Sequence, residues 1–296
     1  MLLGLPEFEM FLPRTVEETC SLLSKYGEDA QLFAGGTDLF IKMKQRRLVS
    51  RILINIKRIP ALDQIRYDAD EGLRIGALTT IQSIQDSAVI SKQFRVLSQA
   101  AGVLGTPQIR NLGTLGGNLA NASPSAEFAP PLLTLEASLR CVGPAGERLV
   151  PMNQFFVGPG KSVLGRGEWI TEVRVPNSPI RAQAIYLKHS LRMMDVSMAG
   201  AAAFVLLDGD LCREVRIALG AVAPTPFRAG MAEATLRGKR LSGNSKDREL
   251  LEEVGRIASG ESLPIDDLRG YALYRRKIVG MLVRQGLEQV VARARN

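Results

Sequence analysis

Apolar residues near the start of the chain alternate between helical spacing and short continuous runs. They recur every third or fourth position over 15–26, behind a Thr-x-x-Glu capping box, and this pattern predicts a helix. Compact apolar runs at 30–34 and 51–56 predict two buried strands, and a helix over about 39–43 is expected between them. We therefore expect a small α/β unit with a Gly-Gly turn after its first strand.

A second unit with the same alternation follows. The pattern predicts a strand at 73–77, a short helix from Thr79 or Thr80 to about Asp86, and an apolar helical face over 94–104. Glycine, proline and polar residues are so frequent over 105–131 that regular structure is not expected to dominate there, although interspersed apolar residues indicate a packed segment. Alternation over 168–175 predicts a strand that ends before Pro176.

The character of the chain changes after the Asn-Ser-Pro segment at 177–179, which has the composition of a linker. Three extended patterns then predict one antiparallel sheet, with strands at 182–188, 199–207 and 215–222. Helical patterns follow, at 231–236, 248–259 and about 268–293. We expect a sheet that is covered by helices.

Composition limits the classes of protein that fit. The chain has 296 residues, 46% of them hydrophobic and 23% charged, which suits a folded chain of two domains. Its longest apolar stretch, 198–207, is far shorter than the roughly 18 residues of a membrane span, and the first residues lack the basic region of a signal peptide. Cys20, Cys141 and Cys212 are isolated, as in a reducing compartment. A cytoplasmic protein without a membrane span is expected.

The single histidine, His189, makes a His-rich metal site and most hydrolytic schemes poor hypotheses, so we expect neither metal ligands nor catalytic residues in this chain. The formal charge of +8 and the seven basic residues between Phe40 and Leu62 raise the alternative of nucleic-acid binding. Aromatic residues are only 5% of the chain and no nucleic-acid-binding motif lies nearby, so no nucleic-acid partner is expected. The role of the basic run Lys42 to Arg58 stays open.

Two glycine-rich segments carry the candidate chemistry: Phe33-Ala34-Gly35-Gly36-Thr37-Asp38-Leu39 and Gly113-Thr114-Leu115-Gly116-Gly117-Asn118. Adjacent glycines let backbone approach a ligand closely, and consecutive amides in such turns can converge on an anion such as a pyrophosphate. Neither segment matches a Walker loop or the GxGxxG pattern of Rossmann folds. Either one alone could be an ordinary turn.

The two segments belong to a longer ordered series. The other members are Ile75-Gly76-Ala77-Leu78-Thr79, Gln108-Ile109-Arg110-Asn111 and Ala122-Ser123-Pro124-Ser125-Ala126-Glu127. The series resembles the FAD-binding medium subunit of the molybdenum hydroxylases, the family of carbon monoxide dehydrogenase and xanthine dehydrogenase. The resemblance extends to Tyr186-Leu187-Lys188, Ile217-Ala218-Leu219-Gly220 and Tyr274-Arg275-Arg276. It implies an α+β fold: a PCMH-type FAD-binding domain at 1–176, with subdomains at about 1–57 and 58–176, and a C-terminal domain at 177–296 with a three-stranded antiparallel sheet and helices.

The resemblance also implies the residues that hold FAD. Both glycine loops would converge on its pyrophosphate, Glu127 would be the acidic residue on the adenosine side, where aspartate is more usual, and Lys188 would lie near the isoalloxazine. The alternative for Lys188 is an exposed lysine on a strand edge. The implied set is Leu32, Phe33, Ala34, Gly35, Gly36, Thr37, Asp38, Leu39, Leu104, Thr114, Gly116, Gly117, Asn118, Asn121, Ser123, Glu127, Ile170 and Lys188.

By the same resemblance, the chain passes electrons from iron–sulfur clusters of a small subunit through FAD to NAD or another acceptor. The substrate is oxidised at a molybdenum cofactor on a large subunit, and the complex is a dimer of heterotrimers. No histidine precedes His189, so the FAD is expected to be non-covalent, and the three cysteines do not supply an iron–sulfur cluster. Two alternatives stay open: a stand-alone FAD-dependent reductase or dehydrogenase, and a non-enzymatic module that binds a phosphate ligand or nucleic acid.

Overall fold

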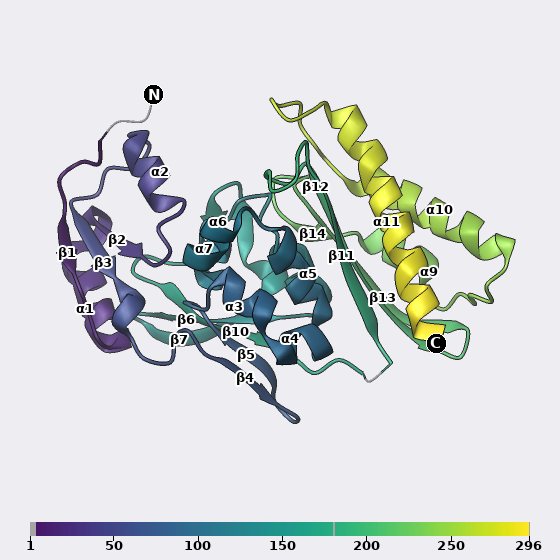
Figure 1. Ribbon diagram of the computed structural model, residues 1–296, viewed down its shortest axis with the longest axis horizontal. Helices are drawn as coiled ribbons and strands as arrows, with labels where there is room; N and C mark the ends of the chain where they lie inside the picture. Colours follow the sequence, from purple (N-terminus) through teal and green to yellow (C-terminus); the bar gives the residue numbers. More distant parts are fainter. Residues whose placement is uncertain (1–3, 180, 296) are drawn as a thin grey trace.

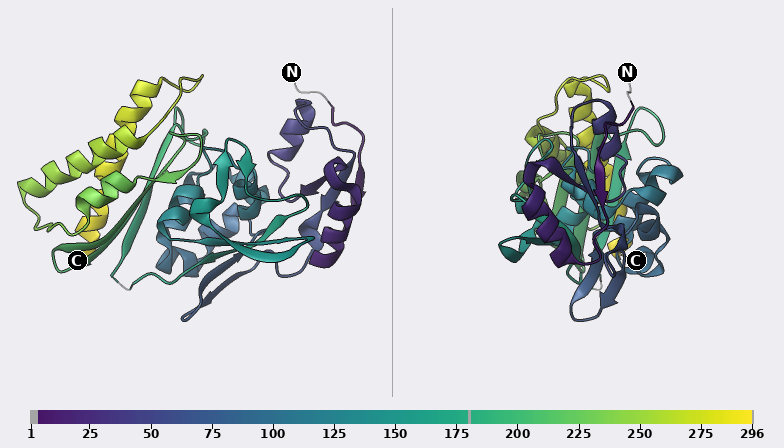
Figure 2. Two further views of the ribbon diagram at one scale, coloured as in Figure 1. Left: turned by 180° about the vertical axis from the view of Figure 1, so that it is seen from behind. Right: turned by 90° about the vertical axis from the view of Figure 1, so that its left-hand side faces the viewer.

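The computed structural model describes residues 4–179 and 181–295. A small N-terminal sheet, a middle layer of sheet and helices, and a C-terminal sheet with long helices follow one another along the molecule (Figures 1 and 2). The described strands form a three-stranded, a five-stranded and a four-stranded sheet, together with a separate two-stranded pair. The predicted α+β organisation is thereby confirmed.

The N-terminal subdomain is a three-stranded parallel sheet of β1 (Glu9–Phe11), β3 (Ile52–Asn55) and β2 (Ala30–Phe33). Helix α1 (Val16–Tyr26) begins at Thr15, whose side chain accepts a hydrogen bond from the Glu18 amide, as the capping box predicts. Helix α2 (Leu39–Lys44) follows β2 directly after the Gly-Gly turn. The turn therefore lies where the chain leaves the carboxyl end of a strand.

The middle subdomain places short helices over an antiparallel sheet. In their order across the sheet, its strands are β4 (Ile65–Asp68), β5 (Gly72–Gly76), β10 (Trp169–Val175), β6 (Ser138–Gly143) and β7 (Gly146–Pro151). Strands β8 (Phe156–Gly158) and β9 (Lys161–Ser162) form a separate pair. Helix α3 (Ile81–Asp86) matches the short helix predicted to end at about Asp86, and α5 (Arg95–Val103) carries the apolar face predicted over 94–104. Helix α4 (Ala88–Gln93) lies between them and was not predicted. These elements enclose one hydrophobic core.

The expectation of irregular structure over 105–131 is wrong. Helices α6 (Pro107–Leu112) and α7 (Leu115–Ala120) occupy much of this segment, and α8 (Ala129–Thr134) begins within it. The prolines of α6 and α8 lie in the first helical turn, where a missing amide hydrogen costs nothing, and Thr106 and Thr114 cap α6 and α7. These prolines mark helix starts here, and do not break helices.

The C-terminal sheet is antiparallel, as predicted, but it has four strands where three were expected. Strands β11 (Gln183–His189), β12 (Ala199–Asp208) and β13 (Leu211–Gly220) match the prediction, and β14 (Phe227–Arg228) adds a two-residue edge. Helices α9 (Gly230–Leu236), α10 (Ser245–Glu261) and α11 (Ala272–Arg295) follow. Helix α11 starts later than 268 because Asp267 and Gly270 pair in a turn.

Both faces of this C-terminal sheet are buried. Along β12, Ala202 and Phe204 pack into the core of the middle subdomain, whereas Ala201, Ala203 and Val205 pack under α9, α10 and α11. Figure 1 shows the sheet between the middle helices and α11. The C-terminal sheet therefore shares a core with the middle subdomain. Among the described helices none combines the length and the apolar character needed to cross a bilayer.

Candidate functional site

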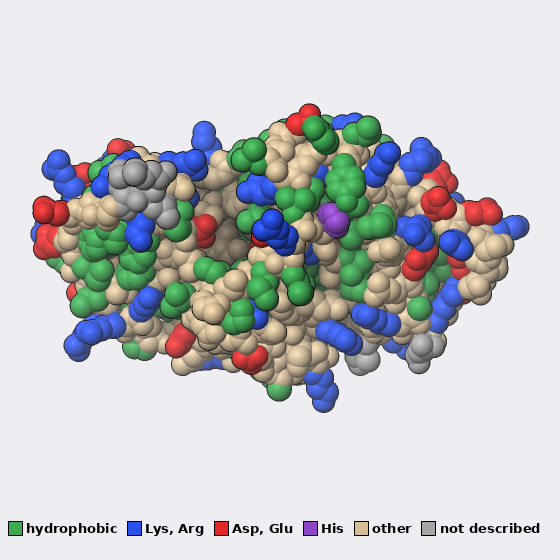
Figure 3. All heavy atoms as spheres, turned by 45° about the horizontal axis from the view of Figure 1, so that its top comes forward, with side chains coloured by type: hydrophobic (Ala, Val, Ile, Leu, Met, Phe, Trp, Pro, Cys, Tyr) green, Lys and Arg blue, Asp and Glu red, His purple; other side chains and the backbone are tan. Residues whose placement is uncertain are grey.

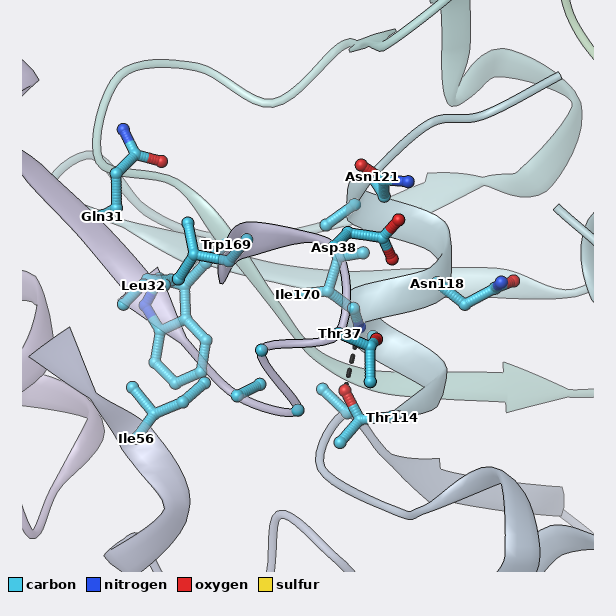
Figure 4. A pocket seen from close by; sticks show the side chains of 18 of the residues that line it. Gln31, Leu32, Thr37, Asp38, Ile56, Thr114, Asn118, Asn121, Trp169 and Ile170 are labelled. Atoms are coloured by element: carbon cyan, nitrogen blue, oxygen red, sulfur yellow. Dashed lines mark hydrogen bonds between the residues drawn. The ribbon is translucent and has the colours of Figure 1, made fainter. Parts of the chain in front are cut away.

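A cavity of about 770 Å³ opens between the N-terminal and middle subdomains. Figure 3 shows a hollow on the corresponding face of the molecule, and Figure 4 shows part of its wall. This volume is typical of a site for a small molecule or cofactor. The structure brings most of the predicted residues together in this wall: Leu32, Ala34, Gly35, Gly36, Thr37, Asp38, Leu39, Leu104, Thr114, Gly116, Gly117, Asn118, Asn121 and Ile170.

The first glycine loop lies in the cavity wall, between β2 and α2. Gly36 has a φ of +75°, a conformation that favours glycine, and the turn carries the chain from β2 into α2. No described residue accepts a hydrogen bond from the backbone amides of 35–38. The Asp38 side chain makes no capping hydrogen bond, although the residue precedes α2. Consecutive unpaired amides of this kind suit a bound anion.

The second glycine loop uses most of its backbone donors within the chain: five of the six amides over 113–118 have a partner, and that of Thr114 has none among the described residues. The Gly116 amide donates to the Ala77 carbonyl (2.9 Å), and the Gly117 amide donates to Thr114 Oγ1 (3.1 Å). The Asn118 amide donates to the Thr114 carbonyl (2.9 Å). These donors are used because the segment winds directly into α7, with Thr114 as its cap. This loop therefore offers fewer backbone donors than the first, and its contact with a pyrophosphate stays a prediction.

The two glycine loops pack against neighbouring backbone. A Cβ atom on Gly35 would overlap the carbonyl oxygen of Leu112, at the start of the second loop. A Cβ on Gly116 would lie 2.7 Å from the Ala77 Cβ. Figure 4 shows Thr37 of the first loop beside Thr114 of the second. Gly35 is therefore required by the contact between the subdomains and Gly116 by packing within the middle subdomain, whatever the cavity binds.

Two polar atoms in residues of the cavity wall lack partners. Asn118 Oδ1 and Trp169 Nε1 are both shielded from solvent, and neither has a hydrogen-bond partner among the residues that the structure describes. A buried unpaired donor or acceptor costs roughly 1–3 kcal/mol, so such atoms are normally satisfied by something. Their position points to a ligand with its own donors and acceptors.

Four predicted residues lie outside this wall: Phe33, Ser123, Glu127 and Lys188. Lys188 Nζ lies 2.9 Å from Glu127 Oε1 and also donates to the Val103 carbonyl (2.9 Å). The Lys188 side chain is only 4% exposed, so the alternative of an exposed edge lysine is wrong. Burial raises the pKa of the Glu127 carboxyl, and the Lys188 charge opposes this rise.

The Glu127–Lys188 contact places these two implied cofactor-binding residues side by side. Lys188 donates to Val103, whose neighbour Leu104 lines the cavity wall. Both side chains are therefore near Leu104 and serve first to join the middle subdomain to β11.

Several residues in the cavity wall were not predicted. They include Trp169, beside the predicted Ile170, as well as Ile56, Lys42 and Arg47. Trp169 is the only tryptophan in the chain and starts the central strand β10. Its position next to the predicted residue Ile170 could have indicated that it lines the cavity. Lys42 and Arg47 belong to the basic run Lys42 to Arg58, for which the sequence alone predicts no role.

A cavity between two subdomains, with a Gly-Gly turn that presents free amides, defines a protein that binds a phosphate-bearing cofactor. Residues 6–178 match the family model described as the FAD binding domain in molybdopterin dehydrogenase. Residues 184–290 match the CO dehydrogenase flavoprotein C-terminal domain. The chain belongs to the family of FAD-binding medium subunits of the molybdenum hydroxylases.

The similarity covers nearly the whole chain. The carbon monoxide dehydrogenase medium chain of Hydrogenophaga pseudoflava is 33% identical over 288 residues, which cover 97% of this chain and 98% of that one. The putative xanthine dehydrogenase FAD-binding subunit of Escherichia coli (strain K12) is 32% identical, with coverage of 95% and 94%. The solved carbon monoxide dehydrogenase from Hydrogenophaga pseudoflava superposes with a TM-score of 0.93 at 34% identity, covering 98% of this chain and 99% of that chain.

Proposed function

We propose that this chain is the FAD-binding electron-transfer subunit of a molybdenum hydroxylase. In this role it takes electrons from iron–sulfur clusters of a small subunit and passes them through FAD to NAD or another acceptor. The observation that carries the proposal is the cavity at the contact of the two glycine loops, with free amides at 35–38. Membership of the medium-subunit family supports the cofactor.

The residues of the cavity fit FAD. The free amides of the first loop suit its pyrophosphate, and the unpaired Asn118 Oδ1 and Trp169 Nε1 suit the polar edges of its ring systems. Leu104 and Ile170 supply apolar wall for the isoalloxazine, which excludes water from it. When bound, FAD supplies the redox chemistry. No histidine or cysteine lines the cavity among the described residues, which supports non-covalent binding.

The chain's own residues position the cofactor and carry out no acid–base step. The 35–38 amides would hold the pyrophosphate, and Thr37 with Asn118 would orient the groups on either side of it. We assign Glu127 and Lys188 to the end of the cavity near Leu104, as a buried pair that braces β11. In this assignment Glu127 no longer contacts the adenosine ribose.

The same proposal extends to partners and location. Relatives are named as medium chains, and one as a subunit of the 6-hydroxypseudooxynicotine dehydrogenase complex. We propose an iron–sulfur small subunit and a molybdopterin large subunit as partners, in a cytoplasmic dimer of heterotrimers. The FAD-binding domain would comprise 1–176, with subdomains at about 1–57 and 58–176, and the C-terminal domain 177–296.

The test is to purify the chain alone and titrate it with FAD. We expect saturable binding of one FAD per chain, with the flavin released unmodified by acid. A chain that neither carries flavin absorption nor binds added FAD would contradict the proposal. Turnover of a small substrate by the isolated flavoprotein, without partner chains, would favour a stand-alone dehydrogenase instead.

A further inference from the structure

Lys42 links the segments that follow the two glycine loops. Its Nζ donates a hydrogen bond to Asn121 Oδ1 at 2.6 Å, across 79 positions of the chain. Lys42 follows the first loop by one helical turn, since its amide donates to the Asp38 carbonyl. Asn121 follows Gly117 by one turn in the same way. The link therefore joins α2 of the N-terminal subdomain to the end of α7 across the cavity.

The Lys42 ammonium has a neutral partner only. No described carboxylate lies within ion-pair distance of it, and an amide oxygen satisfies one of its three donors. Lys42 and Asn121 both line the cavity, and Figure 4 shows Asn121 beside Asp38 of the first loop. A negatively charged group held by the 35–38 amides would be a stronger partner for this ammonium than Asn121.

The other five cations of the basic run are not part of the cavity wall. Lys57 Nζ lies 4.4 Å from the centre of the Phe33 ring, and Arg46 donates to the Gly4 and Met43 carbonyls. Lys44 is on the same helix as Lys42 but is not part of the cavity wall. Lys42 and Arg47 are the two members of the run that reach the cavity wall.

We propose that Lys42 is a phosphate-binding residue of the cavity. Its ammonium pairs with the cofactor's pyrophosphate and exchanges the Asn121 hydrogen bond for one to a phosphate oxygen. Because Lys42 and Asn121 belong to different subdomains, this exchange would break a hydrogen bond between the two subdomains when the cofactor binds. This inference rests on the proposed function, since it takes FAD as the ligand.

The experiment compares FAD binding by the wild-type chain, Lys42→Met and the matched control Lys44→Met. A charge-assisted hydrogen bond predicts an FAD dissociation constant that is about 10- to 100-fold higher in Lys42→Met and nearly unchanged in Lys44→Met. Lys42→Arg keeps the charge and should retain most of the affinity. The salt dependence of FAD binding should also be weaker in Lys42→Met than in the wild-type chain.

Competition by ADP and by adenosine separates phosphate binding from a merely structural role. The inhibition constant of ADP against FAD should rise in Lys42→Met, whereas that of adenosine should not change. Equal losses for ADP and adenosine, or equal FAD affinity in Lys42→Met and Lys44→Met, would overturn the inference while leaving FAD binding itself intact. Failure of the wild-type chain to bind FAD would instead remove the proposed function.

Discussion

Glu127 and Lys188 form a buried ion pair that joins the loop before α8 to strand β11, with 2.9 Å between Oε1 and Nζ. The two side chains are 9% and 4% exposed, so both charges have lost most of their water. Such a pair contributes little net stability when intact, but either charge becomes costly once its partner is removed. This asymmetry can be measured.

Replacing one partner of the pair should destabilise the chain by about 3–5 kcal/mol, because the other charge stays buried without a counter-ion. We expect this loss for Glu127→Gln and for Lys188→Met, and a double variant whose loss is well below the sum. Urea unfolding of the FAD-free chain measures each value. Arg213→Met serves as the control, because Arg213 pairs with Asp208 at the surface and should cost less than about 1 kcal/mol. Additive losses at Glu127 and Lys188 would contradict a direct coupling.

The cost of Lys188→Met should depend on pH. Burial raises the pKa of Glu127 in the folded chain and Lys188 lowers it, so removing Lys188 raises this pKa further. A raised folded-state pKa contributes stability at low pH that is lost as pH rises through it. The variant's loss relative to wild type should therefore be smaller at pH 5 than at pH 8. Equal losses at both values in urea unfolding would show that Glu127 stays ionised throughout.

Trp169 should report directly on the cavity. It is the only tryptophan of the chain, lies in the cavity wall and is 3% exposed. FAD bound beside it should quench its emission saturably, with the same dissociation constant that flavin absorbance gives. Trp169→Phe should lose the signal and, because it lacks the Nε1 donor, bind FAD up to about 10-fold more weakly. Unchanged tryptophan emission at saturating FAD would place the cofactor away from this wall.

The three thiols should differ sharply in reactivity. Burial raises the pKa of Cys141 to about 11 and that of Cys212 to about 11, so both stay neutral and unreactive at pH 8. Cys20 is half-buried. A coloured disulfide reagent should therefore label one thiol in the native chain and three in denaturant, and Cys20→Ser should remove the native reaction. Rapid native labelling of a second thiol would show that one of the cores opens.

Local pattern was enough to predict seven of the described strands and most of the described helices, because each buries one regular face. The short strands β1, β4, β6, β7, β8 and β9 were not predicted. Local pattern also failed over 105–131, where Pro107, Pro130 and Pro131 occupy first helical turns and so suggest irregular structure on composition alone. Strand β14 has two residues, too few for any periodicity. The turn at Asp267 and Gly270 delays α11 through contacts that apolar spacing does not reveal.

The cavity was predicted less completely than the fold. Its glycine loops are short continuous segments, which can be predicted from the sequence. The pairs Lys42–Asn121 and Glu127–Lys188 instead join residues 79 and 61 positions apart. No local pattern signals which of seven basic residues reaches a distant asparagine. The hydrogen bond from the Gly117 amide to Thr114 Oγ1 was also not predicted, because it caps α7 and this helix was not expected.

Because Gly35 and Gly116 are closely packed, the presence of both glycines in a related sequence is not by itself a sign that the relative binds flavin. A side chain at either position collides with protein atoms, so selection for a stable fold would keep both glycines even in a lineage that had abandoned flavin. The sequence of such a protein would still contain both glycine-rich segments. Whether a distant member remains a working flavoprotein is better judged from the free amides at 35–38 and the cation at 42 than from its glycines.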